Sequence, residues 1–328
     1  MSTLATNVLT LADWAKRRDP NDKMARIAEM LSQSNEILQD VPYMEGNLPT
    51  GHRTTVRSSL PTVGYRRINE GVATSKSTTR QVDYATALLE AWSQVDVELC
   101  RLQGDQAAFR LSESVAFVEA MGQKVASDLF YGNADLDPKA FTGLAPWFAS
   151  TTGDTGQNVI SGGGAGSDNT SIWLVCWGDK SVHGIYPKGT QAGLEHNPTD
   201  NVTVYDASGN PYKAHQDQYI WRPGLAIRDW RYIVRIANVD SSNLTANSSA
   251  ADIIDLLIQA YHRIPNFEGV KAGIYCNRTV RTAIDRQARK DGKVYLTIEN
   301  VQGKPQTSFW GVPFRTVDKL TNAEATVS

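Results

Sequence analysis

The sequence of 328 residues has few cysteines, no excess of charge of either sign and no long apolar run. Cys100, Cys176 and Cys276 are odd in number and widely spaced, which fits neither a disulfide framework nor a zinc site. We therefore expect reduced thiols, as in a protein made in a cytoplasm. The 33 basic and 35 acidic residues give a net charge of −2, without the marked basic excess that is typical of nucleic-acid binders.

Signals for membrane insertion and secretion are missing as well. No stretch reaches the roughly 20 apolar residues that a membrane helix needs. The opening segment, MSTLATNVLTLADWAKRRDP, lacks the continuous apolar centre of a signal peptide. An apolar content of 41% and a charged content of 21% are those of an ordinary globular protein, so we expect no membrane partner.

Catalytic and metal-binding patterns are also scarce. The five histidines include no His-x-x-x-His pair. Asp135-x-Asp137 resembles the start of a calcium loop, but Pro138 follows and no glycine occupies the sixth position, so we interpret it as a polar turn. The glycine-rich segment 150–170 lacks the Gly-Lys-Ser/Thr ending of a phosphate-binding loop. We predict no catalytic residue, no cofactor and no metal site.

One alternative of another class stays open, a soluble metal-dependent enzyme. Its ligands would come from His183 and from the fragments Glu195-His196 and His215-Gln216-Asp217, if these meet in space. Two such fragments are expected by accident in a chain of this length, which favours a structural role.

The N-terminal region predicts an arm with short helices. Asp19-Pro20 is a helix start signal, and Met24, Ile27, Ala28 and Leu31 then recur at helical spacing. This region is too short for a core of its own. It must therefore pack on its own domain or extend to a neighbouring subunit.

The segment HRTTVRSSLPTVGYRRI predicts strands near 54–56 and 62–65, because it is rich in β-branched residues. Between Gly46 and Arg80 the only acid is Glu70. The basic residues of this span are Arg53, Arg57, Arg66, Arg67, Lys76 and Arg80. Such a local excess suggests an acidic partner, although a solvated face is the simpler interpretation.

The clearest element is a long helix from Asp105 to Tyr131. We expect Asp105 to cap it and Gly132 to end it in the left-handed conformation. If continuous, it spans about 40 Å at ~1.5 Å per residue. Its predicted core stripe comprises Leu111, Val115, Val118, Gly122, Val125 and Leu129.

The rest of the chain mixes strands and helices irregularly, which indicates an α+β fold. Strands are expected at 171–177, around the turn Ser208-Gly209-Asn210-Pro211, near 230–240 and at 273–276. Helices are expected from the opening Ser249-Ala250-Ala251-Asp252 to about Arg263, and after Asn277, which caps the second helix. Further strands follow near the C-terminus.

Three stretches together resemble one known family: EGNLPTGHRTTVRSSLPTVGYRRINEGV, YGNADLDPKAFTGLAP, and YCNRTVRTAIDRQARKDGKVYL with SFWGVPFRTVDKL. They resemble, in turn, the extended hairpin loop, the exit of the spine helix and the C-terminal strand–helix–strand of tailed-bacteriophage major capsid (coat) proteins with the Hong Kong 97-type fold. The similarity is greatest to coat proteins of short-tailed phages, and the hairpin segment is its most specific part.

The resemblance implies a division of the chain. Its parts would be an N-terminal arm at 1–45, an extension loop at 46–85, a peripheral domain at 86–149 with its spine helix at 105–131, an axial domain at 150–290 and return strands at 291–328. It also favours a strand for Arg80–Trp92, which periodicity alone leaves ambiguous between strand and helix.

The resemblance further implies a function. The protein would assemble as hexamers and pentamers into an icosahedral shell around double-stranded DNA, without sequence-specific DNA contacts. A separate scaffold protein, a portal and a decoration or cement protein would be its other partners. It would be synthesised in the bacterial host cytoplasm and reside in the virion. The six basic residues of the loop would contact neighbouring subunits. A bacterial nanocompartment shell of the same fold is the alternative.

Overall fold

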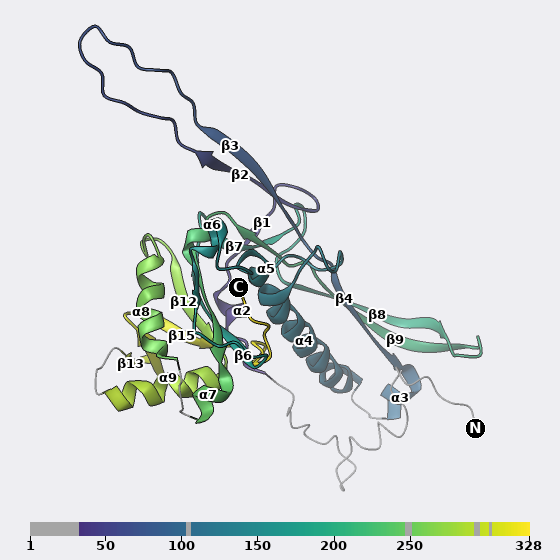
Figure 1. Ribbon diagram of the computed structural model, residues 1–328. Helices are drawn as coiled ribbons and strands as arrows, with labels where there is room; N and C mark the ends of the chain where they lie inside the picture. Colours follow the sequence, from purple (N-terminus) through teal and green to yellow (C-terminus); the bar gives the residue numbers. More distant parts are fainter. Residues whose placement is uncertain (1–32, 103–105, 247–250, 292–295, 302–303) are drawn as a thin grey trace.

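The computed structural model describes residues 33–102, 106–246, 251–291, 296–301 and 304–328 (Figure 1). The arm helix expected at 24–31 and the Asp105 cap lie outside these ranges.

The helical elements are α2 (Ile37–Asp40), α3 (Val97–Leu102), α4 (Gln106–Tyr131), α5 (Leu144–Trp147), α6 (Gly153–Gly156), the 3-10 turn η1 (Trp230–Tyr232), α7 (Ser241–Ala246), α8 (Ile253–Arg263) and α9 (Arg278–Asp291). The strands are β1 (Tyr43–Glu45), β2 (Gly51–Ser59), β3 (Thr78–Ala85), β4 (Leu89–Asp96), β5 (Val159–Ser161), β6 (Asn169–Trp177), β7 (Val182–Tyr186), β8 (Leu194–Tyr205), β9 (Pro211–Trp221), β10 (Gly224–Ile227), β11 (Ile233–Asp240), β12 (Lys271–Cys276), β13 (Leu296–Val301), β14 (Lys304–Phe309) and β15 (Val312–Thr316).

The largest sheet has ten strands, and it draws on both ends of the chain. Its main path runs β1-β7-β6-β12-β15-β14-β13, while β10 pairs with β7, and β11 pairs with β6 and β5. The central strand β6 is buried at every position. This explains why SIWLVCW lacks the polar alternation of a half-exposed strand, since both of its faces meet a core.

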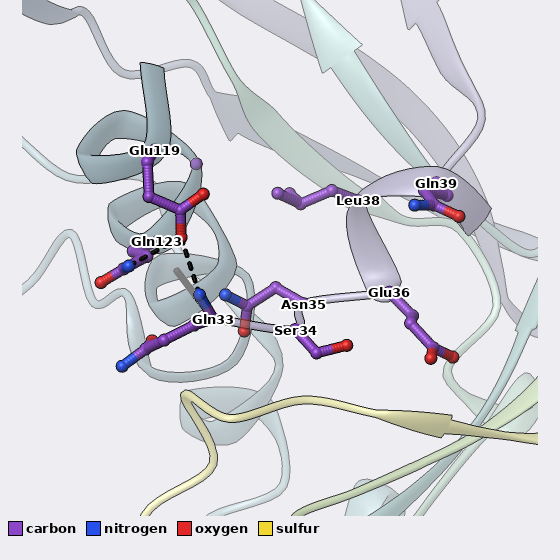
Figure 2. A pocket seen from close by; sticks show the side chains of 9 residues that line it. Gln33, Ser34, Asn35, Glu36, Leu38, Gln39, Glu119 and Gln123 are labelled. Atoms are coloured by element: carbon purple, nitrogen blue, oxygen red, sulfur yellow. Dashed lines mark hydrogen bonds between the residues drawn. The ribbon is translucent and has the colours of Figure 1, made fainter. Parts of the chain in front are cut away.

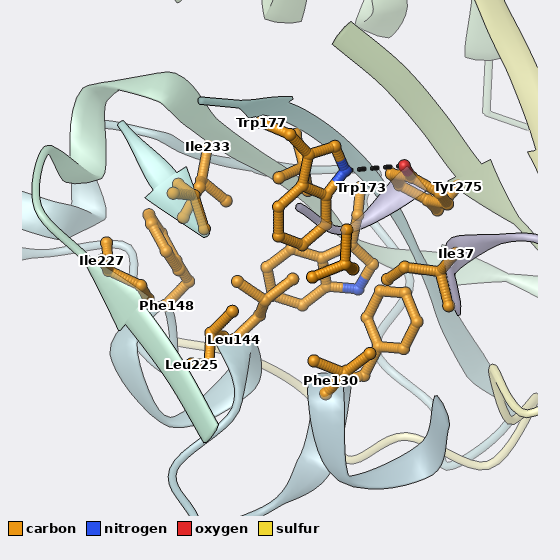
Figure 3. Close-up of a cluster of buried hydrophobic side chains, with 14 of the residues drawn as sticks. Ile37, Phe130, Leu144, Phe148, Trp173, Trp177, Leu225, Ile227, Ile233 and Tyr275 are labelled. Atoms are coloured by element: carbon orange, nitrogen blue, oxygen red, sulfur yellow. Dashed lines mark hydrogen bonds between the residues drawn. The ribbon is translucent and has the colours of Figure 1, made fainter. Parts of the chain in front are cut away.

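Successive side chains of β6 point to opposite faces. Trp173, Val175 and Trp177 join the core that contains Phe130 and the short helix α5, and the Trp177 indole donates to the Tyr275 hydroxyl at 2.7 Å (Figure 3). The side chains of Ile172, Leu174 and Cys176 join a second core beneath α8 and α9. The long helix α4 therefore ends against one face of the sheet, and the two C-terminal helices cover the other.

A separate three-stranded sheet has the order β4-β9-β8 and packs along α4. The predicted axial segment 150–290 includes β8 and β9, yet these two strands pair with β4 instead of the ten-stranded sheet. The hairpin β8–β9 therefore lies beside the helix that precedes it by about a hundred positions, as Figure 1 shows. Sequence periodicity detects the strands but not the sheet that they join.

A third sheet consists of β2 and β3 alone and projects away from the rest of the molecule (Figure 1). The strand predicted at 62–65 is wrong, because residues 60–77 form no regular strand between β2 and β3. Pro61 lacks the amide proton that a ladder needs, and Gly64 adds no side chain to pack. The continuous strand expected at Arg80–Trp92 is interrupted at 86–88, and the short helix α3 follows β4.

The long helix α4 ends at Tyr131, where the Gly132 amide donates to the Asp128 carbonyl at 2.9 Å. Gly132 does not adopt a positive φ, so the expected left-handed ending is wrong. A Cβ at this position would lie 2.4 Å from the Phe141 carbonyl oxygen. Glycine is needed here because the returning segment passes close to the helix end.

The predicted stripe of α4 is only half buried in this chain. Val125 and Leu129 are 1% and 0% exposed, whereas Leu111, Val115 and Val118 are 66%, 45% and 43% exposed. The prediction of a core role for these three residues is therefore wrong within one chain. The N-terminal half of α4 instead packs through a neighbouring face, where Phe117 stacks on Tyr219 with ring centroids 5.7 Å apart.

The predicted Asn277 cap is confirmed, because its side chain accepts from the Val280 amide at 2.9 Å. The helix expected to open at Ser249-Ala250-Ala251-Asp252 is capped by Asp252, whose carboxylate accepts from the Asp255 amide at 3.1 Å. In the turn after α4, the Asp137 carboxylate accepts from the Lys139 amide at 3.1 Å. These aspartate and asparagine side chains hold nearby backbone amides, as their position before a helix or within a turn suggests.

Candidate assembly surfaces and the junction between them

The β2–β3 hairpin carries the predicted basic residues, and one of them is already paired. Arg53 makes two bonds to the Asp83 carboxylate across the hairpin, at 2.6 and 2.7 Å. This bidentate pair lowers the pKa of Asp83 and raises that of Arg53. Arg53 therefore has an acidic partner within its own hairpin, and its expected contact with a neighbouring subunit stays a prediction.

The other basic residues of the hairpin differ from Arg53. The Arg66 guanidinium donates to the Glu70 carbonyl at 3.3 Å, a neutral acceptor. Within the described ranges, no ion pair involves Arg57, Arg66, Arg67, Lys76 or Arg80. Five positive charges are thus displayed on a projecting hairpin without a fixed counter-charge.

The hairpin also exposes large apolar side chains near its tip. Val63 is 87% exposed and Ile68 is 92% exposed. Leu60, Tyr65 and Val72 are exposed too. The sequence-based prediction of contact residues named only basic side chains, although apolar side chains in a segment without a core of its own are a usable signal. Several large apolar side chains exposed on one short segment are typical of a site of protein association.

The root of the hairpin is held closely against the body. The Tyr84 hydroxyl donates to the Ile227 carbonyl, and a Cβ on Gly51 would lie 2.0 Å from the Tyr84 carbonyl oxygen. His52 packs against His183 with ring centroids 5.9 Å apart. Burial, followed by the proximity of His52, lowers the pKa of His183 to about 4. The base of the hairpin is therefore packed against the body, whereas the rest of the hairpin projects from it.

A groove of about 520 Å³ lies beside the root. One wall is the segment from Val56 to Leu60 of the outgoing strand, and the other is the segment from Arg228 to Arg231. Arg231 is engaged by Asp229 at 2.7 Å, and Arg228 lies 3.4 Å from Asp179. The groove therefore lies between one strand of the hairpin and an arginine-containing segment of the body.

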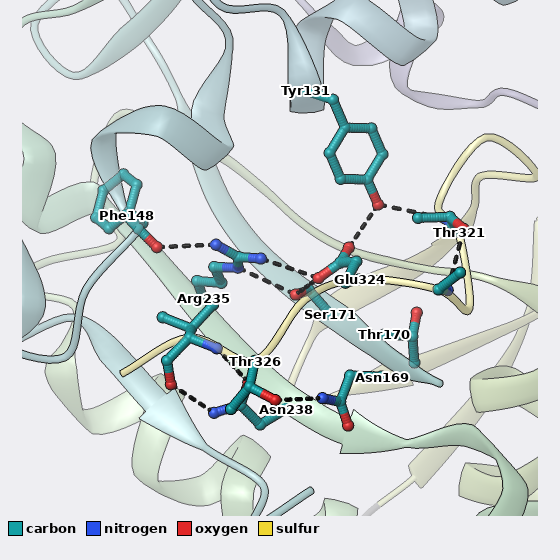
Figure 4. Close-up of polar contacts among 12 residues, drawn as sticks. Tyr131, Phe148, Asn169, Thr170, Ser171, Arg235, Asn238, Thr321, Glu324 and Thr326 are labelled. Carbon is teal, nitrogen blue, oxygen red and sulfur yellow. Dashed lines mark hydrogen bonds and ion pairs between the residues drawn. The ribbon is translucent and has the colours of Figure 1, made fainter. Parts of the chain in front are cut away.

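A buried polar junction connects α4 to the large sheet (Figure 4). The Arg235 guanidinium donates to the Glu324 carboxylate at 2.9 Å and to the Phe148 carbonyl at 2.9 Å. The same carboxylate accepts from the hydroxyls of Ser171 and Tyr131. Burial, followed by the adjacent Glu324, raises the pKa of Tyr131. One ion pair therefore joins the end of α4, two strands and the C-terminal tail.

A pocket of about 330 Å³ lies between the start of the described chain and α4 (Figure 2). The Gln33 amide donates to the Glu119 carboxylate at 2.9 Å, and Gln123 donates to the same oxygen at 2.8 Å. These bonds lower the pKa of Glu119, that from Gln123 most. The pocket marks where the arm meets the helix.

The histidines of the enzyme alternative lie in two places. His196 bonds Asp217 at 3.0 Å and His215 bonds Asp200 at 2.9 Å, while Arg110 bonds both aspartates at 2.7 and 2.6 Å. An arginine therefore occupies the centre of this cluster, where a cation ligand set would need space. His183 lies apart, against His52. Within the described ranges, no group of three or more His, Cys, Asp or Glu side chains could hold a metal ion.

The helices of the described chain include none that is long and apolar enough to cross a membrane.

Comparison with known proteins gives concordant matches. A family model described as major capsid protein GP7 matches residues 19–328. A chain from the cryo-EM structure of bacteriophage Epsilon15 is 32% identical with a TM-score of 0.77, over 100% of this chain and 99% of that chain. The capsid of bacteriophage JBD30 is 11% identical with a TM-score of 0.54, over 90% of this chain and 96% of that chain, which shows the fold alone.

An encapsulin complex from Synechococcus elongatus is 10% identical with a TM-score of 0.45, over 71% of this chain and 97% of that chain, too low to carry an argument. No match was found among curated proteins.

Proposed function

Since this chain belongs to the family of major capsid proteins, we propose that its β2–β3 hairpin is the element with which each copy holds a neighbouring copy in the shell. The chain has the Hong Kong 97-type fold and is a structural component of the phage virion, not an enzyme. Many copies of it form the capsid shell.

The observation that carries the proposal is the composition of the hairpin tip. Leu60, Val63, Tyr65 and Ile68 are exposed in one chain, and the adjacent basic side chains have no fixed counter-charge within the described residues. A two-stranded hairpin is marginally stable alone in water. Burial of the tip against another copy, with the basic residues facing carboxylates, would supply the contacts that a single chain does not provide.

The shell itself would be built from hexamers and pentamers. The hairpin and the surface that it meets are different parts of the molecule, so the contact is heterologous and closes into a ring by rotation. A net charge of −2 limits repulsion among many identical copies, while the hairpin provides local charge complementarity.

The remaining partners follow from this role. The shell would enclose double-stranded DNA without sequence-specific contacts, assemble on a separate scaffold protein and carry a portal and a decoration or cement protein. Synthesis would take place in the cytoplasm of the bacterial host.

We propose the following division of the chain: an arm at 1–45, a hairpin loop at 46–85, a peripheral domain at 86–149 joined by β8 and β9, an axial domain from the rest of 150–290, and return strands at 291–328. Pairing of β8 and β9 with β4 supports this revised boundary.

The double variant Arg66→Glu with Arg67→Glu tests the role of the hairpin. Because both side chains project from the body, the variant should fold as the wild type does by circular dichroism. It should fail to form closed shells by sedimentation and negative-stain microscopy. Lys180→Glu with Lys188→Glu makes the same change in net charge at exposed positions outside the hairpin and should assemble normally.

Closed shells from the Arg66/Arg67 variant at wild-type yield would contradict an assembly role for these charges. An unfolded variant would show instead that the hairpin contributes to the core of its own chain.

A further inference from the structure

The groove beside the hairpin root combines apolar surface with an arginine in each of its two walls. Arg57 belongs to the wall formed by the hairpin and Arg228 to the facing wall, and both side chains are exposed. Val56, Leu60 and Trp230 line the same groove. Its volume of about 520 Å³ is in the range of pockets that enclose a small ligand, so a few side chains would fill it.

The positive charge of the groove is not fully neutralised by its own chain. Within the described ranges, no ion pair involves Arg57. Arg228 lies 3.4 Å from Asp179, in an exposed pair of the kind that contributes little to stability. Arg231 differs from both, because the Asp229 carboxylate accepts from its guanidinium at 2.9 and 2.7 Å. Two guanidinium groups on opposite walls are therefore open to carboxylates of a partner.

The turn after α4 has the complementary composition. Leu136 is 84% exposed, and its neighbours on both sides, Asp135 and Asp137, are exposed carboxylates. Neither aspartate forms an ion pair in the described part of the chain. Among the large apolar side chains that are exposed there, Leu136 is the only one with an acidic residue on each side. One leucine flanked by two carboxylates matches an apolar groove with two arginines in both charge and size.

Hydrogen bonds within the turn hold it in this shape. The Asn133 carbonyl accepts from the amides of Leu136 and Asp137 at 3.2 and 2.9 Å. The Asn133 side chain accepts from the Asp135 amide at 2.9 Å, and the Asp137 carboxylate accepts from the Lys139 amide at 3.1 Å. The exposed leucine is thus presented on a turn that is already formed, which reduces the entropy lost on docking.

We propose that this turn of one copy docks into the groove of a neighbouring copy, with Leu136 on the apolar lining. Asp135 and Asp137 then face the guanidinium groups of Arg57 and Arg228. No residue of the turn lines the groove of its own chain, so the contact is one between copies. Turn and groove are different parts of the molecule, as a heterologous contact in a closed shell requires. The docking rests on the proposed function, because strand β2 of the hairpin forms one wall.

Charge reversal in the full-length chain tests the pairing. Arg57→Glu with Arg228→Glu, and separately Asp135→Arg with Asp137→Arg, should each leave a subunit that is folded by circular dichroism. Each should lower the yield of closed shells at least about ten-fold, because like charges then face each other at the interface. Combining all four changes should restore the yield to within about three-fold of the wild type, since opposite charges face each other again.

A matched control separates pairing from a change in net charge. Asp154→Arg with Glu268→Arg alters two exposed acidic residues outside the turn, and should neither impair assembly nor rescue the groove variant. Normal assembly of the turn variant, failure of the fourfold variant or rescue by the control would overturn the docking. If the Arg66/Arg67 variant still fails to assemble, the proposed role of the hairpin survives such a result.

Cross-linking gives a second readout that does not depend on reversed charges. Leu136→Cys and Ser58→Cys each replace an exposed side chain, and the native cysteines are buried. Shells assembled from a mixture of the two single variants and treated with a short bismaleimide should give an interchain product that links positions 58 and 136. Gln259→Cys, on α8, replaces Ser58→Cys as the control and should give none. Absence of the 58–136 product, or an equal yield from the control, would contradict the docking.

Discussion

The guanidinium of Arg235 lies 2.9 Å from the carboxylate of Glu324, and these side chains are only 6% and 5% exposed. Arg235 belongs to the large sheet, whereas Glu324 belongs to the C-terminal tail. The same carboxylate also accepts a hydrogen bond from the hydroxyl of Tyr131, which lies in the last turn of α4. One buried charge pair therefore links the end of the long helix to the sheet and to the C-terminal tail, beside the apolar contacts of Leu129 and Phe130.

Glu324→Ala should lower the free energy of unfolding by about 3–5 kcal/mol, because it leaves the Arg235 charge buried without a partner. Urea unfolding of the subunit, followed by circular dichroism, measures the change. Asp83→Asn breaks the exposed pair with Arg53 and should hardly shift the urea midpoint. Equal effects of the two variants would show that the buried pair does not hold the junction.

Val125→Asp and Val118→Asp distinguish the two halves of the α4 stripe. Val125 is 1% exposed, so a carboxylate there would be buried without a partner and should prevent folding. Val118 is 43% exposed, so its aspartate should leave a folded subunit. Soluble yield and thermal melting measure both effects. Unfolding of the Val118 variant to the same extent would mean that the original prediction of a continuous core stripe was right.

The triple variant Val63→Ser, Tyr65→Ser and Ile68→Ser tests the apolar part of the hairpin tip. Its subunit should melt at the wild-type temperature, because these side chains contact little within their own chain. Assembly should require a higher protein concentration, since each buried apolar side chain contributes about 1.5–3 kcal/mol on association. Light scattering against concentration measures this threshold. An unchanged threshold would remove the tip from the subunit interface.

The His52–His183 pair predicts a loss of stability in mild acid. Burial, together with His52 and Arg228, lowers the pKa of His183 to about 4, against the opposing effect of Asp179. An unfolded histidine titrates near pH 6.5, so below this pH the unfolded chain binds more protons. The free energy of unfolding should therefore fall as the pH drops from about 6.5 toward 4. The pKa of His52 is lowered too, which acts in the same direction.

Urea midpoints between pH 7 and pH 4.5 measure this dependence. His183→Gln should flatten it, whatever its effect on stability at pH 7. His262→Gln changes an exposed histidine and should retain the wild-type slope. A wild-type slope in the His183 variant would assign the acid sensitivity to other groups.

Local patterns predicted most secondary structure because the causes are local. The Asp252 and Asn277 caps, the apolar run of β6 and the turn between β8 and β9 each depend on a few adjacent residues. The period of α4 identified the helix but not its buried face. A period gives the spacing of apolar residues, whereas the covered face depends on elements from elsewhere, such as Tyr219 of β9.

The candidate surfaces were predictable only in part. The basic hairpin was found because its composition contrasts with the rest of the chain. The pairing of Arg53 with Asp83 was missed because register across a hairpin cannot be counted when its loop is long and irregular. The junction at Arg235 and Glu324 was missed for a similar reason, since these residues are 89 positions apart.

The C-terminal tail contacts residues near the start of the described chain, so these contacts can form only after the tail has been synthesised. The Ser34 amide donates to Asp318 at 2.8 Å across 284 positions, and Asn35 forms a bridge with Val317. At ~5–20 residues per second, the ribosome releases the hairpin on the order of ten seconds or more before this tail. The body that holds the hairpin root is incomplete during that interval. A growing chain therefore exposes the hairpin before the contacts of its own C-terminal tail have formed.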